Sequence, residues 1–128
     1  MRRVVFENSL VTIEEDPLEH IVWVRRSPER AEVSALFSTY ANAMTQLSDT
    51  HRQWALILDM RNAPGNNSDA FESSTNDLRT KLRSIFPRVV VLVSTTVGEL
   101  QVKRMARESG LETLVTHNES QVISWCKS

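Results

Sequence analysis

Residues 54–74, WALILDMRNAPGNNSDAFESS, contain the transition that decides the fold. An apolar run ends at Asp59, passes through Pro-Gly-Asn-Asn at residues 64–67, and enters Asp69-Ala-Phe-Glu72. A short apolar run bounded by turn residues is typical of a buried strand. An acceptor followed three residues later by glutamate is the spacing of a helix capping box. The stretch therefore predicts a buried strand over 55–59, a loop, and a helix that starts near Asp69.

The segments that follow repeat this alternation of strand and helix. The helix from Asp69 has an apolar inner face and ends before Pro87, because proline disfavours helical backbone in the residue before it; the face comprises Phe71, Leu78, Leu82 and Ile85. RVVVLVS, residues 88–94, predicts a second buried strand. A capping-box spacing at Thr96–Glu99 predicts the start of a helix that stops at Gly110. The segment ETLVTH (112–117) predicts a short strand. A last helix, which contains Val122 and Trp125, is expected to start at Asn118.

The first third of the chain has the composition of strands. RVVFEN (3–8), LVTIEED (10–16) and HIVWVRR (20–26) are rich in β-branched and aromatic residues and joined by short connections. Ser27-Pro28 then places a hydroxyl before a proline, which predicts a helix start. Apolar residues at spacings of three and four extend that helix from about residue 28 to 47; they are Val33, Leu36, Phe37, Tyr40, Met44 and Leu47.

The element order is therefore β-β-β-α-β-α-β-α-β-α within one domain over 1–128. We expect an α/β fold with a single mixed sheet: antiparallel N-terminal strands, and a parallel βαβαβα C-terminal part with right-handed crossovers. The arrangement depends on residues 55–59 and 89–93 being inner neighbours in the sheet. Their following turns would then share one rim.

Composition limits the classes of function. Fifteen basic and sixteen acidic residues give a net charge of −1, whereas a nucleic-acid-binding protein is expected to have a basic excess. The longest uncharged apolar run, residues 89–94, is far below the ~20 residues of a membrane span. A single cysteine, Cys126, excludes an internal disulfide and fits a reducing compartment. We expect no nucleic-acid partner, no integral membrane association and a cytoplasmic location.

The strand ending in Asp59, followed by a helix start that contains Ser68, resembles the STAS superfamily of anti-sigma-factor antagonists. In that family a buried strand ending in aspartate leads to a phosphorylatable serine or threonine at a helix start. The family's usual aspartate-serine-small-glycine loop is absent, and NAPGNNSDAF (62–71) stands in its place. Ser73 and Ser74 are further positional equivalents of Ser68. The chain resembles more closely a divergent STAS-like branch related to lipid-binding CRAL-TRIO domains, and the likeness implies bacterial-type regulation without a cofactor.

Three interpretations of this loop remain open. It is a plain connection, in which residues 64–67 turn the chain and Ser68 or Asp69 caps the helix. Alternatively, Ser68 is phosphorylated, since a helix N-terminus stabilises an added phosphate. The third interpretation is a binding site, because loops at the carboxyl ends of parallel strands bind small molecules. Polar residues for a partner or ligand at this rim are Asp59, Arg61, Asn62, Asn66, Asn67, Ser68, Ser94, Thr95 and Thr96.

Other kinds of site have little support. His20, His51 and His117 lack metal-binding spacings, and no G-x-S-x-G nucleophile elbow is present, so neither metal ligands nor catalytic residues are assigned. Trp23 points away from Val22 and Val24 in its strand. If only one face of the sheet is covered, the exposed face is a surface for a partner or a homodimer; otherwise helix residues such as Trp125 cover it.

The leading hypothesis is a non-enzymatic regulatory domain that recognises a protein partner through the loop 61–69 and the helix start after it. The alternative is a small-molecule or lipid-head-group binder that uses the loops after the strands 55–59 and 89–93.

Overall fold

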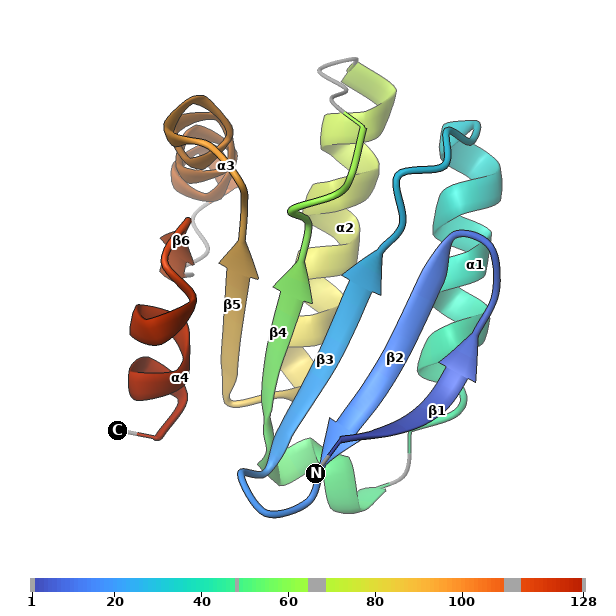
Figure 1. Ribbon diagram of the computed structural model, residues 1–128. Coiled ribbons are helices and arrows are strands. Elements are labelled where there is room, and N and C mark those ends of the chain that lie inside the picture. The colour runs from blue at the N-terminus through green and yellow to red at the C-terminus, as the bar shows by residue number, and fades with distance from the viewer. Residues whose placement is uncertain (1, 48, 65–68, 110–113, 128) are drawn as a thin grey trace.

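In the computed structural model, which describes residues 2–47, 49–64, 69–109 and 114–127, six strands form one mixed sheet (Figure 1). The strands are β1 (Arg3–Glu7), β2 (Val11–Asp16), β3 (Ile21–Arg26), β4 (Ala55–Asp59), β5 (Arg88–Leu92) and β6 (Leu114–Thr116). The helices are α1 (Val33–Met44), α2 (Asp69–Ile85), α3 (Thr96–Ser109) and α4 (Glu119–Lys127), with a 3₁₀ helix, η1, at Asp49–Gln53.

The strands lie in chain order, β1-β2-β3-β4-β5-β6. Pairing is antiparallel from β1 to β3 and parallel from β3 to β6, which confirms the expected α/β fold. β4 and β5 are inner neighbours, with Leu56 opposite Val89 and Leu58 opposite Val91. The Met60 N–H also donates to the Leu92 carbonyl oxygen at 2.8 Å, so the chain leaves both strands at one rim.

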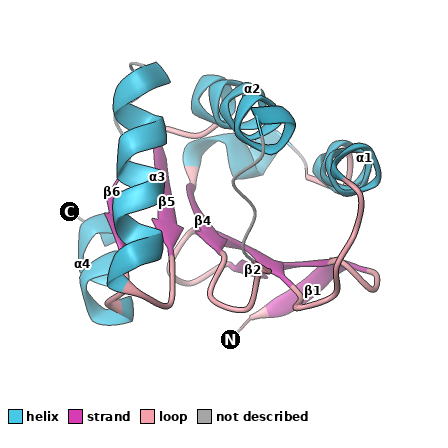
Figure 2. Cartoon of the chain, turned by 90° about the horizontal axis from the view of Figure 1, so that it is seen from above, coloured by secondary structure: helices cyan, strands magenta, loops and turns pink. Residues whose placement is uncertain are grey.

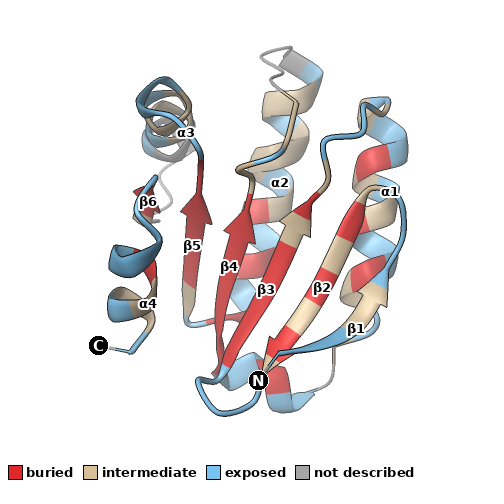
Figure 3. Cartoon of the chain, in the orientation of Figure 1, coloured by how far each residue is buried: buried red, intermediate tan, exposed pale blue. Residues whose placement is uncertain are grey.

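The sheet separates two apolar clusters. The helix face, which α1, α2 and α3 cover, carries the larger cluster with Val24, Leu58 and Val91. The opposite face carries Trp23, Ile57 and Val90, against which Val122 and Trp125 of α4 pack. Figure 2 shows α1 and α2 on one side of the strands and α4 on the other. The central strands are buried along their length (Figure 3), as expected when both faces of parallel strands are covered.

Trp23 is only 1% exposed, so the interpretation in which it forms an open surface is wrong. The Arg2 guanidinium lies 3.8 Å from the Trp23 ring centroid, and Val22 and Val24 are buried on the other face. Trp23 therefore offers no argument for a homodimer.

The first helix begins at Val33, five residues later than the sequence pattern predicts. Arg26 donates to the carbonyl oxygens of Ser27 and Glu29, at 2.6 Å each, and the Ser27 hydroxyl donates to the Ser9 carbonyl oxygen at 2.6 Å. These contacts tie residues 27–29 to the sheet as a linker, so Ser27 does not cap a helix. The residue before α1, Glu32, makes no capping hydrogen bond with its side chain.

Two other helix starts test the predicted caps. The N-cap of α3 is Thr95 instead of Thr96, because the Thr95 hydroxyl accepts a hydrogen bond from the Gly98 N–H at 3.0 Å. The predicted cap of α4 is confirmed, since the Asn118 side-chain oxygen accepts from the Ser120 N–H at 3.0 Å. The caps proposed for Ser68 and Asp69, and the stop at Gly110, lie outside the residues and side chains that the structure describes.

Candidate functional site

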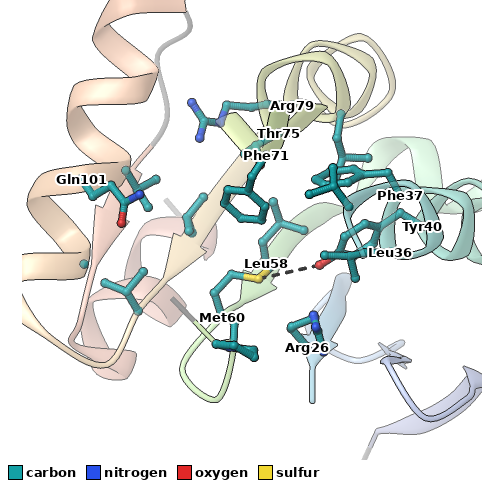
Figure 4. A pocket seen from close by; sticks show the side chains of 18 of the residues that line it. Arg26, Leu36, Phe37, Tyr40, Leu58, Met60, Phe71, Thr75, Arg79 and Gln101 are labelled. Carbon is teal, nitrogen blue, oxygen red and sulfur yellow. Dashed lines mark hydrogen bonds between the residues drawn. The ribbon is translucent and has the colours of Figure 1, made fainter. Parts of the chain in front are cut away.

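A pocket of about 370 Å³ lies between the helix face of the sheet and the three helices that cover it (Figure 4). Its floor is the carboxyl end of the parallel strands, formed by Leu58 of β4 and Val91 of β5 together with Met60 and Val93, which directly follow these strands. The location agrees with the general preference of ligands for the carboxyl ends of strands in α/β sheets. The volume falls within the range of small-molecule sites, roughly 300–1,000 Å³.

The walls of the pocket are mainly apolar and aromatic. Leu36, Phe37 and Tyr40 enter from α1, and Phe71 and Leu78 enter from α2. The Phe37 and Phe71 rings meet edge to face, with centroids 6.1 Å apart. These contacts hold α1 and α2 together above the pocket, whose remaining wall is formed by Gly98, Gln101 and Val102 of α3.

Tyr40 places a hydroxyl among these apolar groups. Its hydroxyl lies 3.9 Å from the Met60 sulfur, a weak acceptor. Burial raises the pKa of Tyr40 to about 12, so the phenol is neutral and able to donate a hydrogen bond at neutral pH.

The charged side chains among the described residues that line the pocket are all basic. Arg26, Arg30 and Arg79 line it, and no aspartate or glutamate occurs among its described lining residues. Arg26 and Arg79 are buried, whereas Arg30 is exposed. The positive charge of two buried guanidinium groups is therefore not balanced by a carboxylate within the described lining.

The two buried arginines differ in their hydrogen bonds. Arg26 donates to the carbonyl oxygens of Ser27 and Glu29, so much of its donor capacity serves the backbone. Arg79 is 2% exposed, and its Nε and Nη1 have no hydrogen-bond partner among the described residues. Burial lowers the pKa of Arg79, although an arginine keeps its charge at neutral pH. In Figure 4 the Arg79 guanidinium extends from α2 toward the side of the pocket formed by α3.

The residues predicted for a site divide between the two faces of the sheet. Ser94 and Thr95 line the mouth of the pocket, as the ligand interpretation expected. Asp59 and Arg61 do not, because side chains alternate along β4: Leu58 and Met60 face the helices, and Asp59 faces the other way. Asn62 and Thr96 are exposed and do not line the pocket. Asn66, Asn67 and Ser68 lie outside the described residues.

Asp59 is the centre of an ion-pair network on the opposite face. Its carboxylate accepts hydrogen bonds from Arg61 Nη2 at 2.7 Å and from Arg25 Nε at 3.2 Å. Arg25 also pairs with Glu14 at 2.5 Å, and Arg61 lies 3.8 Å from Glu119 of α4. Burial alone would raise the pKa of Asp59, but the hydrogen bonds from Arg61 and Arg25 outweigh it and hold that pKa below its ordinary range. This network joins strands to α4 and is structural in character.

A second buried ion pair lies on the helix face, near the amino ends of the parallel strands. His51 Nε2 lies 2.6 Å from Glu15 Oε2, and Arg3 also donates to Glu15. The hydrogen bond with His51, followed by those from Arg3, keeps the pKa of Glu15 below its ordinary value despite burial. The sequence did not predict η1, which positions His51, because its five residues have no apolar period. Over the described residues, no three His, Cys, Asp or Glu side chains converge as metal ligands.

Sequence reasoning missed Arg79, Arg26 and the aromatic wall as site residues. A signal for Arg79 was present: it falls in the same helical stripe as Phe71, Thr75, Leu78 and Leu82, where a charge is out of place. For Arg26, the alternation in β3 puts its side chain on the face of Val22 and Val24. Neither pattern could show that the helices above leave a space beside these side chains.

None of the helices in the described part of the chain combines the length and apolarity that a membrane crossing requires. Comparison with known proteins found no matching family model, no matching curated protein and no matching solved structure.

Proposed function

We propose that this protein is a non-enzymatic binding domain that holds a small, largely apolar molecule between its sheet and α1–α3. The observation that carries the proposal is the pocket of about 370 Å³ at the carboxyl ends of β4 and β5. Its lining combines an apolar floor, aromatic walls and a few polar groups, which is the composition of small-molecule sites. This is the ligand-binding alternative raised by the sequence, with the site moved from the loop to the space beneath the helices.

The same surroundings explain why binding, and not catalysis, is proposed. The titratable side chains among the described lining residues are arginines and Tyr40, whose pKa of about 12 leaves it protonated. General acid–base work at neutral pH needs a group with a pKa near the operating pH. The lining supports recognition by shape and charge.

Fluorescence titration with a neutral, environment-sensitive dye, N-phenyl-1-naphthylamine, tests the proposal. The dye should brighten on binding to the wild-type protein. Val102→Phe fills the pocket from α3 and should weaken binding by tenfold or more, which corresponds to about 1.4 kcal/mol of lost contact. Val97→Phe makes the same change at an exposed position of the same helix that does not line the pocket, and it should bind like wild type. Equal affinity of all three proteins would refute the proposed site.

A protein-contact function is a second candidate, favoured by two exposed apolar residues on α3. Val97 is 77% exposed and Leu100 63%, and they lie three residues apart at the pocket end of the sheet. The sequence-based prediction assigned partner recognition to the loop 61–69 and the helix start after it, with Ser68 as a phosphorylation site. The proposed kinship with STAS-like regulators motivates both assignments and remains a prediction.

Affinity capture with matched variants separates this candidate from the first. A specific partner should be retained by wild type and lost by Leu100→Asp. Leu18→Asp, at an 84% exposed leucine in the β2–β3 turn, should retain it. Peptide mapping after incubation with cell lysate and ATP tests phosphorylation, and an unmodified Ser68 under all conditions would contradict the regulatory assignment.

A further inference from the structure

Two polar groups on the α2 wall of the pocket have no hydrogen-bond partner in the part of the chain that the structure describes. They are the Arg79 guanidinium, at Nε and Nη1, and the Thr75 hydroxyl. The two residues are four apart in the helix, so their side chains lie on one face within a turn of each other. Both line the same pocket.

An arginine buried to this extent normally meets a carboxylate, because an uncompensated charge costs several kcal/mol inside a protein. Two carboxylates of α2 and α3 are paired with other cations. Glu72 on α2 pairs with Arg104 at 2.9 Å, and Glu99 on α3 pairs with Lys103 at 3.0 Å and with His117 at 2.8 Å. Within the described residues, Arg79 takes part in no ion pair. The described part of the fold therefore holds a cation in an apolar site without supplying a counter-ion.

The other charged side chains described in the pocket lining are also positive, like Arg79. Arg26 adds a second buried guanidinium and Arg30 a third at an exposed position, with no acid among the described lining residues. Charge of one sign with low-dielectric walls attracts ligands of the opposite sign. Arg26 uses its N–H groups on backbone carbonyls, whereas Arg79 has N–H groups to donate.

We infer that the ligand of this pocket is an amphiphile with one anionic group, a carboxylate or a phosphate, bound by Arg79 and Thr75. The inference rests on the proposed small-molecule function and names the chemical class of the ligand. The planar guanidinium donates two parallel N–H bonds to such an anion, and the Thr75 hydroxyl donates a third. The apolar body of the ligand lies against the floor and aromatic walls at Leu58, Tyr40 and Phe71.

Calorimetric titration with four probes tests this assignment. Decanoate and decyl phosphate carry both an apolar body and an anionic group; 1-decanol has only the body, and acetate only the anion. Wild type should bind decanoate at least about tenfold more tightly than 1-decanol, the ratio expected for one charge-assisted hydrogen bond. The tighter of decanoate and decyl phosphate identifies the head group.

Three variants of α2 give matched comparisons. Arg79→Met keeps an unbranched side chain without the charge, and it should lose the preference for decanoate while binding 1-decanol like wild type. Arg83→Met, one turn further along the same helix and outside the pocket lining, should keep the preference. Thr75→Val keeps the shape of the side chain without the hydroxyl. It should weaken the binding of decanoate a few-fold and leave the affinity for 1-decanol unchanged.

The outcomes separate this inference from the function on which it rests. Equal affinity of wild type for decanoate and 1-decanol, or an unchanged preference in Arg79→Met, overturns the anionic assignment while the pocket remains a binding site. If acetate binds as tightly as decanoate, the inference that the ligand needs an apolar body is overturned. Absence of binding by all probes and by the neutral dye overturns the pocket function itself. If Arg79→Met does not fold, the selectivity of Thr75→Val decides the assignment.

Discussion

Replacing Asp59 by asparagine separates a structural role for this residue from a ligand-binding role. The Asp59 carboxylate is buried and accepts hydrogen bonds from the Arg61 backbone N–H, Nε and Nη2, at 3.2, 2.9 and 2.7 Å, and from Arg25 Nε at 3.2 Å. Asparagine keeps the shape but carries no charge, and its NH₂ group opposes a donor. We expect Asp59→Asn to fold with a lower free energy of unfolding.

The magnitude follows from the burial of the partners. Removing one member of a fully buried ion pair costs about 3–5 kcal/mol. The Arg25 and Arg61 side chains are 32% and 35% exposed, so water recovers part of the loss. The free energy of unfolding should therefore fall by about 2–3 kcal/mol, which lowers the melting temperature by about 10 °C in a domain of this size.

Urea denaturation followed by tryptophan fluorescence measures this change at several pH values. The native pKa of Asp59 is depressed, so its stabilising contribution is complete above the unfolded value of about 4 and is lost as the pH falls through the native pKa. The difference in the free energy of unfolding between wild type and Asp59→Asn should become smaller as the solution is acidified below about pH 4. Asp49→Asn, at an exposed aspartate of η1, should leave the midpoint unchanged. The reasoning would be refuted if Asp59→Asn lowered the free energy of unfolding by less than about 0.5 kcal/mol at pH 7, or if the difference from wild type did not change with pH.

Three further predictions follow from the two clusters and the second ion pair. Leu56→Ala, at a fully buried position of β4, should lower the free energy of unfolding by about 3 kcal/mol. Leu18→Ala, in an exposed turn, should change it little. Equal urea midpoints of the two variants would contradict the burial of Leu56 in the core. Glu15→Ala removes the carboxylate that contacts His51 and should lower the free energy of unfolding by about 2 kcal/mol, measured by thermal denaturation at pH 7; an unchanged melting temperature would show that the pair is not stabilising. The Cys126 thiol of α4 is half-buried, and burial raises its pKa to about 11, so it should react slowly with Ellman's reagent in the native protein and rapidly in urea; fast native labelling would show that Cys126 does not pack against the sheet.

The fold was predictable because local patterns and the sheet agree with one another. Runs such as 55–59 and 88–94 are apolar without alternation, which strands covered on both faces require. The stripe Phe71–Leu78–Leu82–Ile85 has the helical period, and helices between strands impose parallel neighbours. The sequence predicted the start of α1 wrongly, because side-chain contacts with the sheet decide it. Ser27 is hydrogen-bonded to Ser9, and Arg26 is hydrogen-bonded to residues 27 and 29, so α1 starts only at Val33.

The site was less predictable, because its residues come from six elements, β3, α1, β4, α2, β5 and α3, that meet only in the folded chain. The sequence predicted a site at the rim of the sheet where the pocket lies, and it placed Ser94 and Thr95 there. It also placed Asp59 in the site, although the pleat of β4 turns that side chain to the opposite face, where Arg25 and Arg61 neutralise it.

The amino-acid sequence by itself determined the order of strands and helices, the parallel pairing of β4 with β5, and the end of the sheet at which a site would form. These properties follow from period, turn chemistry and chirality, which act over short stretches of chain. Only the tertiary structure decided that α1, α2 and α3 enclose a pocket, and that Arg79 enters it without a carboxylate among the described lining residues. The physical reason is that enclosed space and counter-ions depend on how side chains from separate elements fill a common volume.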